Sequence, residues 1–308
     1  MGGRLFEHGH DVVMLARGDH GETLARHGLR LESPDGTVIL PVPTVGPPGA
    51  LAIGDDDVLV LAVKSQDTAD AIRALAPTCP VSLPVVCAQN GVENERTALR
   101  WFAHVYGMSV MCPATHLSPG VVQAHSTPIT GILDLGRWPS GAADHLALSV
   151  ATAFRASTFD SEVRDDIARW KWGKLLMNLS NAVEAICGGS ARFGEVTRRA
   201  REEAVACLRS AGIDYVGTEE DAARRGDLLN ALPVAGQSRQ GSSSWQSLAR
   251  RSGAIETDYL NGEIVLLGRL QGVPTPTNAL LQQVANLLAR ERQPPGTIDE
   301  NELLRSLG

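Results

Sequence analysis

The sequence predicts an α/β domain over about residues 1–160 and an all-helical domain over residues 161–308. In the first part, short apolar runs alternate with helix-like stretches, the pattern of a mostly parallel sheet covered by helices. After Phe159 the strand patterns almost disappear and long helical patterns follow one another. A chain of 308 residues is long enough to form two hydrophobic cores.

Two apolar runs carry the prediction of a parallel sheet. Asp57–Val63 ends at Lys64, and Pro84–Ala88 ends at Gln89-Asn90-Gly91. Runs of this kind fit strands that are buried on both faces, and Thr68–Leu75 between them has helical character. The other expected strands are Val12–Ala16, a hairpin of Leu29–Leu31 and Val38–Val42 around Pro34-Asp35-Gly36, and the later strands Val105–Met111, Val121–His125 and Thr130–Leu135.

The second half is expected to consist of five helices. A glycine at position 212 is expected to end the second of them, because glycine is a common helix terminator. The expected helices are Asp165–Ile186, Glu195–Ala211, Glu219–Ala231, Trp245–Leu270 and Asn278–Glu291.

The composition excludes several classes of protein. A net charge of −7 argues against a nucleic-acid-binding surface, which needs clustered basic residues. No apolar run approaches the ~20 residues of a membrane span, and the N-terminus has no signal-peptide pattern. The five cysteines have no metal-ligand spacing, so we expect no metal site. Cys87 and Cys112 lie in apolar runs and are expected to be core thiols, which fits a reducing cytoplasm.

The N-terminal residues resemble the later part of a dinucleotide-binding unit. Gly2 and Gly3 are followed by a short helix ending at Gly9 and by the apolar strand Val12–Ala16. In a Rossmann-type unit, such glycines let a pyrophosphate approach the N-terminus of the first helix. The strand of ~5–6 residues that normally precedes this turn is absent from the sequence. We expect Met1 to be an internal residue of the turn, with the true start upstream.

Three polar residues follow the predicted strands. Arg17 ends the first strand, where NAD-binding units carry an acid, and its guanidinium could pair with the 2′-phosphate of NADPH. A solvated surface arginine is the alternative. Lys64 and Asn90 follow the carboxyl ends of two apolar strands, the edge at which α/β sheets bind ligands. Either residue could instead belong to an ordinary loop.

One helical segment carries a polar stripe on an otherwise apolar surface. At 100° per residue, Asn178 lies about 40° from Lys174, and Asn181 lies about 20° from it on the other side. Asparagine is a poor helix former, so two of them beside one lysine are unusual. The stripe therefore predicts a cleft that holds an ammonium and two amides, although lysine on a helix is ordinarily a solvated charge.

The motifs together resemble the ketopantoate reductases (2-dehydropantoate 2-reductases), from Met1 to about Ala289. Each piece is short, and their order and spacing carry the resemblance. The matching pieces are Gly2-Gly3, Gly9–Val12, Ala16–Gly18, Val63–Ser65, Gln89–Val92, Lys174–Asn178, Ser242–Ser244 and Glu256–Gly262.

The resemblance implies a Rossmann-type NADPH domain joined to a helical domain, with the active site between them. The implied reaction is hydride transfer from NADPH to the C2 ketone of a 2-oxo acid, 2-dehydropantoate, in pantothenate synthesis. The implied roles are Lys174 as proton donor, Asn178 and Ser244 as substrate ligands, Glu256 beside the nicotinamide ribose, Asn90 where cofactor and substrate meet, and Lys64 near the adenosine.

Two departures from the family pattern lie on the substrate side. Relatives often place the second helix asparagine where this chain has Ala182, so Asn181 is expected to take that role. The segment Cys187–Phe193 lacks an asparagine that some relatives use. A reductase of a different ketone therefore stays open, as does a truncated, non-catalytic protein. The sequence also leaves a homodimer open.

Overall fold

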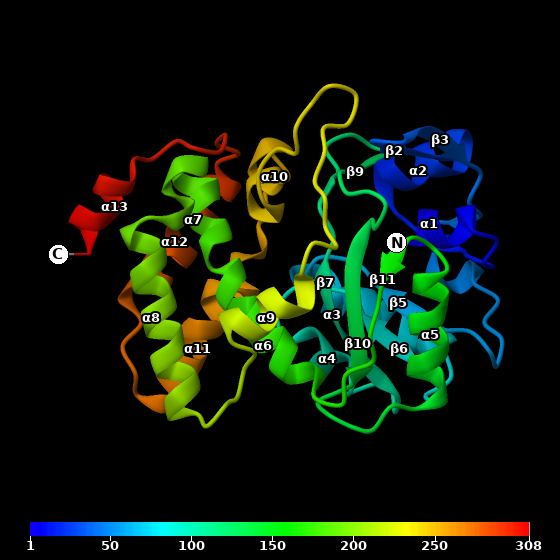
Figure 1. The fold of residues 1–308 in the computed structure, drawn as a ribbon, viewed down its shortest axis with the longest axis horizontal. Helices are drawn as coiled ribbons and strands as arrows, with labels where there is room; N and C mark the ends of the chain where they lie inside the picture. The colour runs from blue at the N-terminus through cyan, green and yellow to red at the C-terminus, as the bar shows by residue number, and fades with distance from the viewer. Residues whose placement is uncertain (308) are drawn as a thin grey trace.

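The computed structural model describes residues 1–307. Its first half is built on a five-stranded sheet (Figure 1). The strand order is β11-β10-β7-β6-β5. β5, β6 and β7 run parallel, β10 is antiparallel to β7, and β11 pairs parallel with β10. The strands span Leu59–Leu61 (β5), Val85–Cys87 (β6), Val105–Met111 (β7), Gly131–Arg137 (β10) and Phe159–Asp160 (β11). This arrangement confirms the predicted, mostly parallel sheet.

Alternation along β6 explains why its sequence reads as one apolar run. Val85 and Cys87 pack in the cluster that contains residues of α3 (Ser65–Leu75), whereas Val86 packs in the cluster that contains residues of α5 (His145–Arg155). All three strand residues are fully buried, so both faces of the strand are covered. The sequence analysis missed α5, whose start is marked by Asp144, which accepts a hydrogen bond from Ala147 N at 2.8 Å.

Two smaller sheets complete the first half. A parallel pair joins β1 (Met14–Leu15) to β4 (Thr44–Val45), so that within residues 1–307 both β1 and β5 have a strand partner on one edge only. The predicted hairpin is confirmed in a four-stranded sheet of order β3-β2-β9-β8. Its strands are β2 (Leu29–Ser33), β3 (Gly36–Leu40), β8 (Ala114–Thr115) and β9 (Val121–Ala124).

The second half is helical, as predicted, and lies beside the sheet domain (Figure 1). The segment expected as one helix over residues 165–186 consists of α6 (Ile167–Asn178) and α7 (Ser180–Cys187). Leu179 between them keeps helical backbone angles, so the two run nearly end to end. The other helices of this half are α8 (Glu195–Ser210), α9 (Thr218–Arg225), α10 (Ser243–Ala249), α11 (Asn261–Gln271), α12 (Pro276–Arg290) and α13 (Glu300–Ser306).

Two predicted helices were too long. The pattern over Trp245–Leu270 predicted a single helix, but the chain forms α10, then the 3₁₀ turn η4 (Glu256–Tyr259), then α11. The break falls at Arg251 and Gly253, whose φ angles of +53° and +79° lie outside the helical region. The helix expected to reach Ala231 likewise ends at Gly226, where φ is +43°. No helix among residues 1–307 combines the length and the apolar character needed to cross a membrane.

An ion cluster ties α9 to the sheet domain. Asp134 of β10 is 2% exposed and accepts hydrogen bonds from Arg224 of α9 and from Arg164, which precedes α6. Each arginine uses two nitrogens, so the carboxylate is held from both sides. The contact fixes α9 against the sheet and thereby places Asp221, on the same helix, near the predicted site.

Candidate active site

Three predicted site residues meet at the junction of the two halves. Lys174 and Asn178 lie one turn apart on α6, and Asn90 follows β6. The Lys174 ammonium lies 3.3 Å from Asn90 Oδ1 and 3.5 Å from Asn178 Oδ1. Asn178 Nδ2 also donates to Asn90 Oδ1 at 3.2 Å. The polar stripe predicted on this helix therefore faces a strand end of the sheet domain.

The ammonium of Lys174 is held in a setting that favours proton release. Burial and the neighbouring charge of Lys171 lower the pKa of Lys174 to about 8, whereas Asp221 and Glu256 oppose that shift. Since the ordinary lysine pKa is 10.5, the group exchanges its proton near neutral pH far more readily than a surface lysine. A lysine of this kind is suited to general acid catalysis.

Glu256 joins the helical half to the start of α3. Its carboxylate Oε1 accepts hydrogen bonds from the backbone N–H of Ser65 at 2.9 Å and from the Ser65 hydroxyl at 2.8 Å. Glu256 is 3% exposed. Asn94 donates to Ser65 Oγ at 3.0 Å and to the Asn90 carbonyl at 2.9 Å. The carboxylate is therefore linked, through Ser65 and Asn94, to the loop that carries Asn90.

Lys64 reaches across to α10. Its ammonium donates to the Ser243 carbonyl at 3.2 Å and to Ser247 Oγ at 2.5 Å, and burial lowers its pKa. These two bonds leave one of its three hydrogens for a ligand. Its predicted place near the adenosine end of a cofactor stays a prediction.

Ser244 on α10 and Asn181 on α7 belong to the helical half and have side-chain polar groups that form no hydrogen bond within residues 1–307. Ser244 is 1% exposed, and its hydroxyl has no hydrogen-bond partner within residues 1–307. The amide of Asn181, a residue 5% exposed, makes no hydrogen bond in that same part of the chain. A buried hydroxyl without a partner is costly. A ligand that accepts a hydrogen bond from Ser244 would remove that cost, so this residue fits a binding role.

The residues expected to hold a dinucleotide phosphate lie on a separate part of the fold. Gly2 and Gly3 form the first turn of α1 (Gly2–Glu7), and a Cβ on Gly3 would come within 2.5 Å of Leu29 Cδ2. Gly3 therefore packs closely against the Leu29 side chain of β2, which would have to move to admit a larger residue. Arg17 precedes α2 (Gly18–His27), is exposed and forms no ion pair with any described residue. No hydrogen bond joins these three residues to the Lys174 cluster in the described part of the chain.

The sequence analysis missed several polar residues behind the site. Ser65, Asn94 and the buried pair Lys171–Glu95 support the Asn90 loop, and Asp221 approaches Lys174 from α9. Lys171 stands one helical turn before Lys174 on α6, so spacing places it near the predicted stripe without indicating that it is buried. The partners on distant elements carried no local signal.

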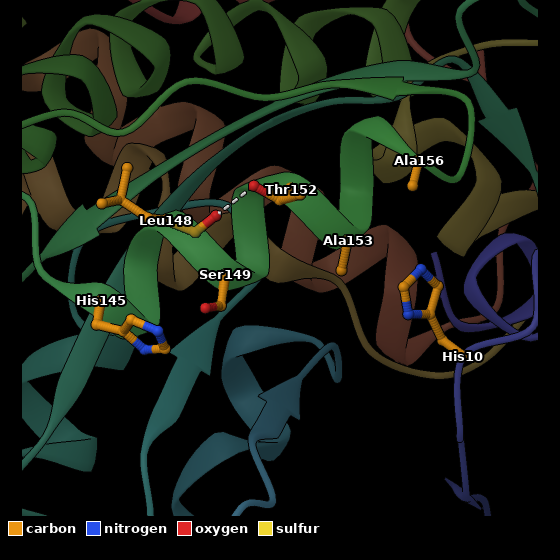
Figure 2. Close-up of a pocket in the computed structure, with 7 residues that line it drawn as sticks. All are labelled: His10, His145, Leu148, Ser149, Thr152, Ala153 and Ala156. Atoms are coloured by element: carbon orange, nitrogen blue, oxygen red, sulfur yellow. Dashed lines mark hydrogen bonds between the residues drawn. The ribbon is translucent and has the colours of Figure 1, made fainter.

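The site does not coincide with a pocket on the outer face of α5. That pocket, of about 530 Å³, lies between α5 and His10 and contains none of the predicted site residues (Figure 2). It is lined by His10, His145, Leu148, Ser149, Thr152, Ala153 and Ala156.

Two models of one protein family match most of the chain. The model for ketopantoate reductase PanE/ApbA matches residues 1–140, and the model for the C-terminal part of the same family matches residues 166–289. The 2-dehydropantoate 2-reductase of Halobacterium salinarum is 29% identical over 92% of this chain and 93% of its own length. The enzyme of that name from Pyrococcus horikoshii is 27% identical over 91% and 90%.

Solved structures give the same result for the fold. A PanE/ApbA family ketopantoate reductase from Ralstonia eutropha superposes with a TM-score of 0.77 at 30% identity, covering 94% of each chain. D-mandelate dehydrogenase in complex with NADH and anilino(oxo)acetate has the same TM-score at 19% identity, which shows the shared fold alone. The chain belongs to the ketopantoate reductase family of NAD(P)-dependent oxidoreductases.

Proposed function

We propose that the protein reduces 2-dehydropantoate to pantoate with NADPH, and that Lys174 donates the proton. The reaction is that of the curated relatives. The observation that carries the proposal is the position of the Lys174 ammonium between two amide oxygens, with a pKa of about 8. Bound NADPH would supply the hydride.

Negative charge develops on the ketone oxygen during reduction, and a positioned cation both stabilises and protonates that oxygen. In this scheme Lys174 Nζ faces the ketone oxygen and transfers one proton to it. Asn90 and Asn178 fix the ammonium, and Asn178 and Asn181 orient the substrate. The free hydroxyl of Ser244 donates to the substrate carboxylate.

The cofactor side would consist of residues of the sheet domain and of Glu256 from the helical half. Gly2 and Gly3 would lie beside the pyrophosphate, Arg17 beside the 2′-phosphate and Lys64 toward the adenosine. Asn90 and Glu256 would lie beside the nicotinamide ribose, which the contact of Glu256 with the start of α3 supports. The unpaired, exposed guanidinium of Arg17 fits an external phosphate.

Replacing Arg17 by aspartate is expected to raise the dissociation constant for NADPH about tenfold or more and to change that for NADH far less. A charge-assisted hydrogen bond to phosphate is worth about 1.5–3 kcal/mol, and the aspartate would also repel the phosphate. Fluorescence titration with both cofactors measures the effect. Arg26→Asp is the control, because Arg26 lies in the last turn of the helix that follows Arg17, is exposed and pairs with no residue among 1–307 except Glu22. An equal loss for NADPH and NADH would refute the role of Arg17.

The rate of ketone reduction is expected to fall as the pH rises through about 8. Lys174 must carry its proton to act as the acid, and its pKa is lowered to about 8 by burial and by Lys171. Below that pH the rate should reach a plateau. The measurement is kcat as a function of pH, in which the fall above pH 8 forms the descending limb of the profile. A Lys174→Arg variant should lack this descending limb, because arginine stays protonated. A profile of the wild type that stays flat above pH 8 would contradict the assignment.

A different 2-oxo acid is the second candidate for the substrate. The feature that favours it is Ala182, which stands where the family resemblance implies an asparagine, while the amide of the buried Asn181 beside it forms no hydrogen bond within residues 1–307. Parallel assays with 2-dehydropantoate and with 2-oxo acids of other side-chain sizes would rank the substrates by kcat/KM. The Lys174 and Ser244 roles would be the same for either candidate.

A further inference from the structure

Lysine is rare in this chain, and every lysine lies at or beside the candidate site. Of 28 basic residues, 25 are arginines, and the three lysines are Lys64, Lys171 and Lys174. Lys64 and Lys174 already have proposed roles. Within residues 1–307, the Lys171 ammonium forms hydrogen bonds to the Gln89 carbonyl and to Glu95, and to none of the side chains predicted to bind substrate or cofactor. Its position beside the site therefore requires a separate explanation.

Lys171 forms a fully buried ion pair with Glu95 of α4 (Asn94–Ala98). The two side chains are 2% and 0% exposed, and the ammonium donates to Glu95 Oε1 and, at 2.9 Å, to the carbonyl oxygen of Gln89. The pair lies over Gly107 of β7, where a Cβ would come within 3.2 Å of Lys171 Cδ and 3.3 Å of Glu95 Oε1. A glycine in the middle of a strand thus leaves room for it.

Stability alone does not account for this pair. Removing two charges from water costs several kcal/mol for each ion, and well-packed apolar side chains of similar size are often at least as stable. The second oxygen of Glu95 has no partner within residues 1–307, and burial raises the pKa of Glu95. The neighbouring thiol of Cys87 is buried as well, and its pKa is raised by burial and by Glu95.

The bond from Lys171 to Gln89 acts directly on the site. Gln89 precedes Asn90, whose side-chain oxygen accepts from both Lys174 and Asn178. Gly91 follows with a φ angle of +77°, and a Cβ there would lie 2.9 Å from the Tyr259 carbonyl. The loop is therefore confined on the helical side by η4 and anchored to α6 by Lys171.

Lys171 also supplies a charge one helical turn from the proposed proton donor. Four charged groups act on Lys174. Lys171 on α6 and Arg239, in the segment before α10, lower the pKa of Lys174. Asp221 on α9 and Glu256 on η4 raise it. Lys171 has the largest effect of the four.

We propose that Lys171, held by Glu95, is a positioning residue of the active site, which fixes Asn90 against Lys174 and acts on Lys174 through its charge. The inference rests on the proposed role of Lys174 as proton donor. The pair would thus set the position and the proton affinity of Lys174 without itself contacting the substrate.

The direct test is the titration of Lys174 in the absence of substrate. Protein labelled with ¹³C only at lysine Cε gives three lysine signals, which the Lys64→Met and Lys174→Met variants assign. We expect Lys171→Met to raise the pKa of Lys174 by on the order of 1 unit, because a nearby like charge is lost. Lys171→Arg should keep the wild-type value. An unchanged Lys174 titration in folded Lys171→Met would overturn the proposal.

A second variant tests whether any change in Lys171→Met comes from the unpaired, buried carboxylate of Glu95. Lys171→Met leaves Glu95 buried without its cation, so the double variant Lys171→Met/Glu95→Gln, which buries no charge, is titrated in parallel. The upward shift should appear there too. If the double variant, folded by its thermal unfolding transition, shows the wild-type titration, the charge of Lys171 has no effect on Lys174 and the proposal is wrong.

Kinetics complete the test. The descending limb of the kcat profile should move to higher pH in Lys171→Met and return in Lys171→Arg, and kcat should fall more than KM rises. Equal losses of kcat in both variants with no shift of the limb would indicate a merely structural role. If no variant and no wild-type protein oxidises NADPH with any 2-oxo acid, the proposed function fails, and the titration still decides whether the pair acts on Lys174.

Discussion

Lys174→Met is expected to lower kcat for ketone reduction by about 10²–10⁴-fold while leaving NADPH affinity nearly unchanged. A positioned general acid contributes a factor of that size, and the variant removes both the proton and the cation beside the ketone oxygen. The side chain contacts Asn90 and Asn178 and none of the residues expected to hold the cofactor phosphates. Methionine keeps the volume and the apolar stem, so the fold should tolerate it.

Stopped-flow measurement of the hydride step and equilibrium titration with NADPH separate the two effects. Arg169→Met is the matched control, because Arg169 lies on the same helix and pairs with Asp214 and Glu220 outside the site. It should keep the wild-type kcat. Undiminished NADPH oxidation in Lys174→Met would remove Lys174 as the proton donor and leave the family membership untouched.

Glu256→Ala is expected to lower kcat/KM about 10²-fold and to destabilise the protein by about 1–3 kcal/mol. The carboxylate accepts both the backbone N–H and the hydroxyl of Ser65, and a buried donor left without an acceptor costs about that much. Loss of the contact frees the loop of Asn90, and displacements of about 1 Å cost a factor of this size in rate. Thermal unfolding and steady-state kinetics measure the two quantities.

Glu256→Gln distinguishes charge from geometry. The amide keeps an acceptor for Ser65, so stability should largely return. The negative charge that favours protonation of Lys174 is lost, so the descending limb of the kcat profile should move to lower pH. That is the opposite of the shift expected for Lys171→Met. A Glu256→Gln profile that coincides with the wild type would show that the carboxylate acts through position alone.

Local periodicity predicted the part of the site that lies on one helix. Lys174, Asn178 and Asn181 fall on one stripe because α6 and α7 continue nearly as one helix, and the structure brings the first two to Asn90. The strand ends before Lys64 and Asn90 were also predicted, since buried parallel strands produce uninterrupted apolar runs. The break between α10 and η4 was missed, because it depends on the positive φ angles of Arg251 and Gly253.

Contacts between distant segments could not be predicted from spacing. Ser65 and Glu256 are separated by 191 positions, and nothing local pairs them. The resemblance to the family predicted Glu256 as a site residue, whereas only the structure identified Ser65 as its hydrogen-bond partner. Lys171 would be taken for a solvated charge on sequence grounds, and only its burial against Glu95 shows otherwise. The roles of Gly2, Gly3 and Arg17 stay predictions, because their function depends on a bound cofactor.

The most direct test is the oxidation of NADPH by the purified protein in the presence of 2-dehydropantoate, followed by mass spectrometry of the product. The proposed function predicts one pantoate formed for each NADPH oxidised, with the rate reduced about 10²–10⁴-fold in Lys174→Met. If folded wild-type protein oxidises neither NADPH nor NADH with 2-dehydropantoate or any other 2-oxo acid, the proposed function is wrong.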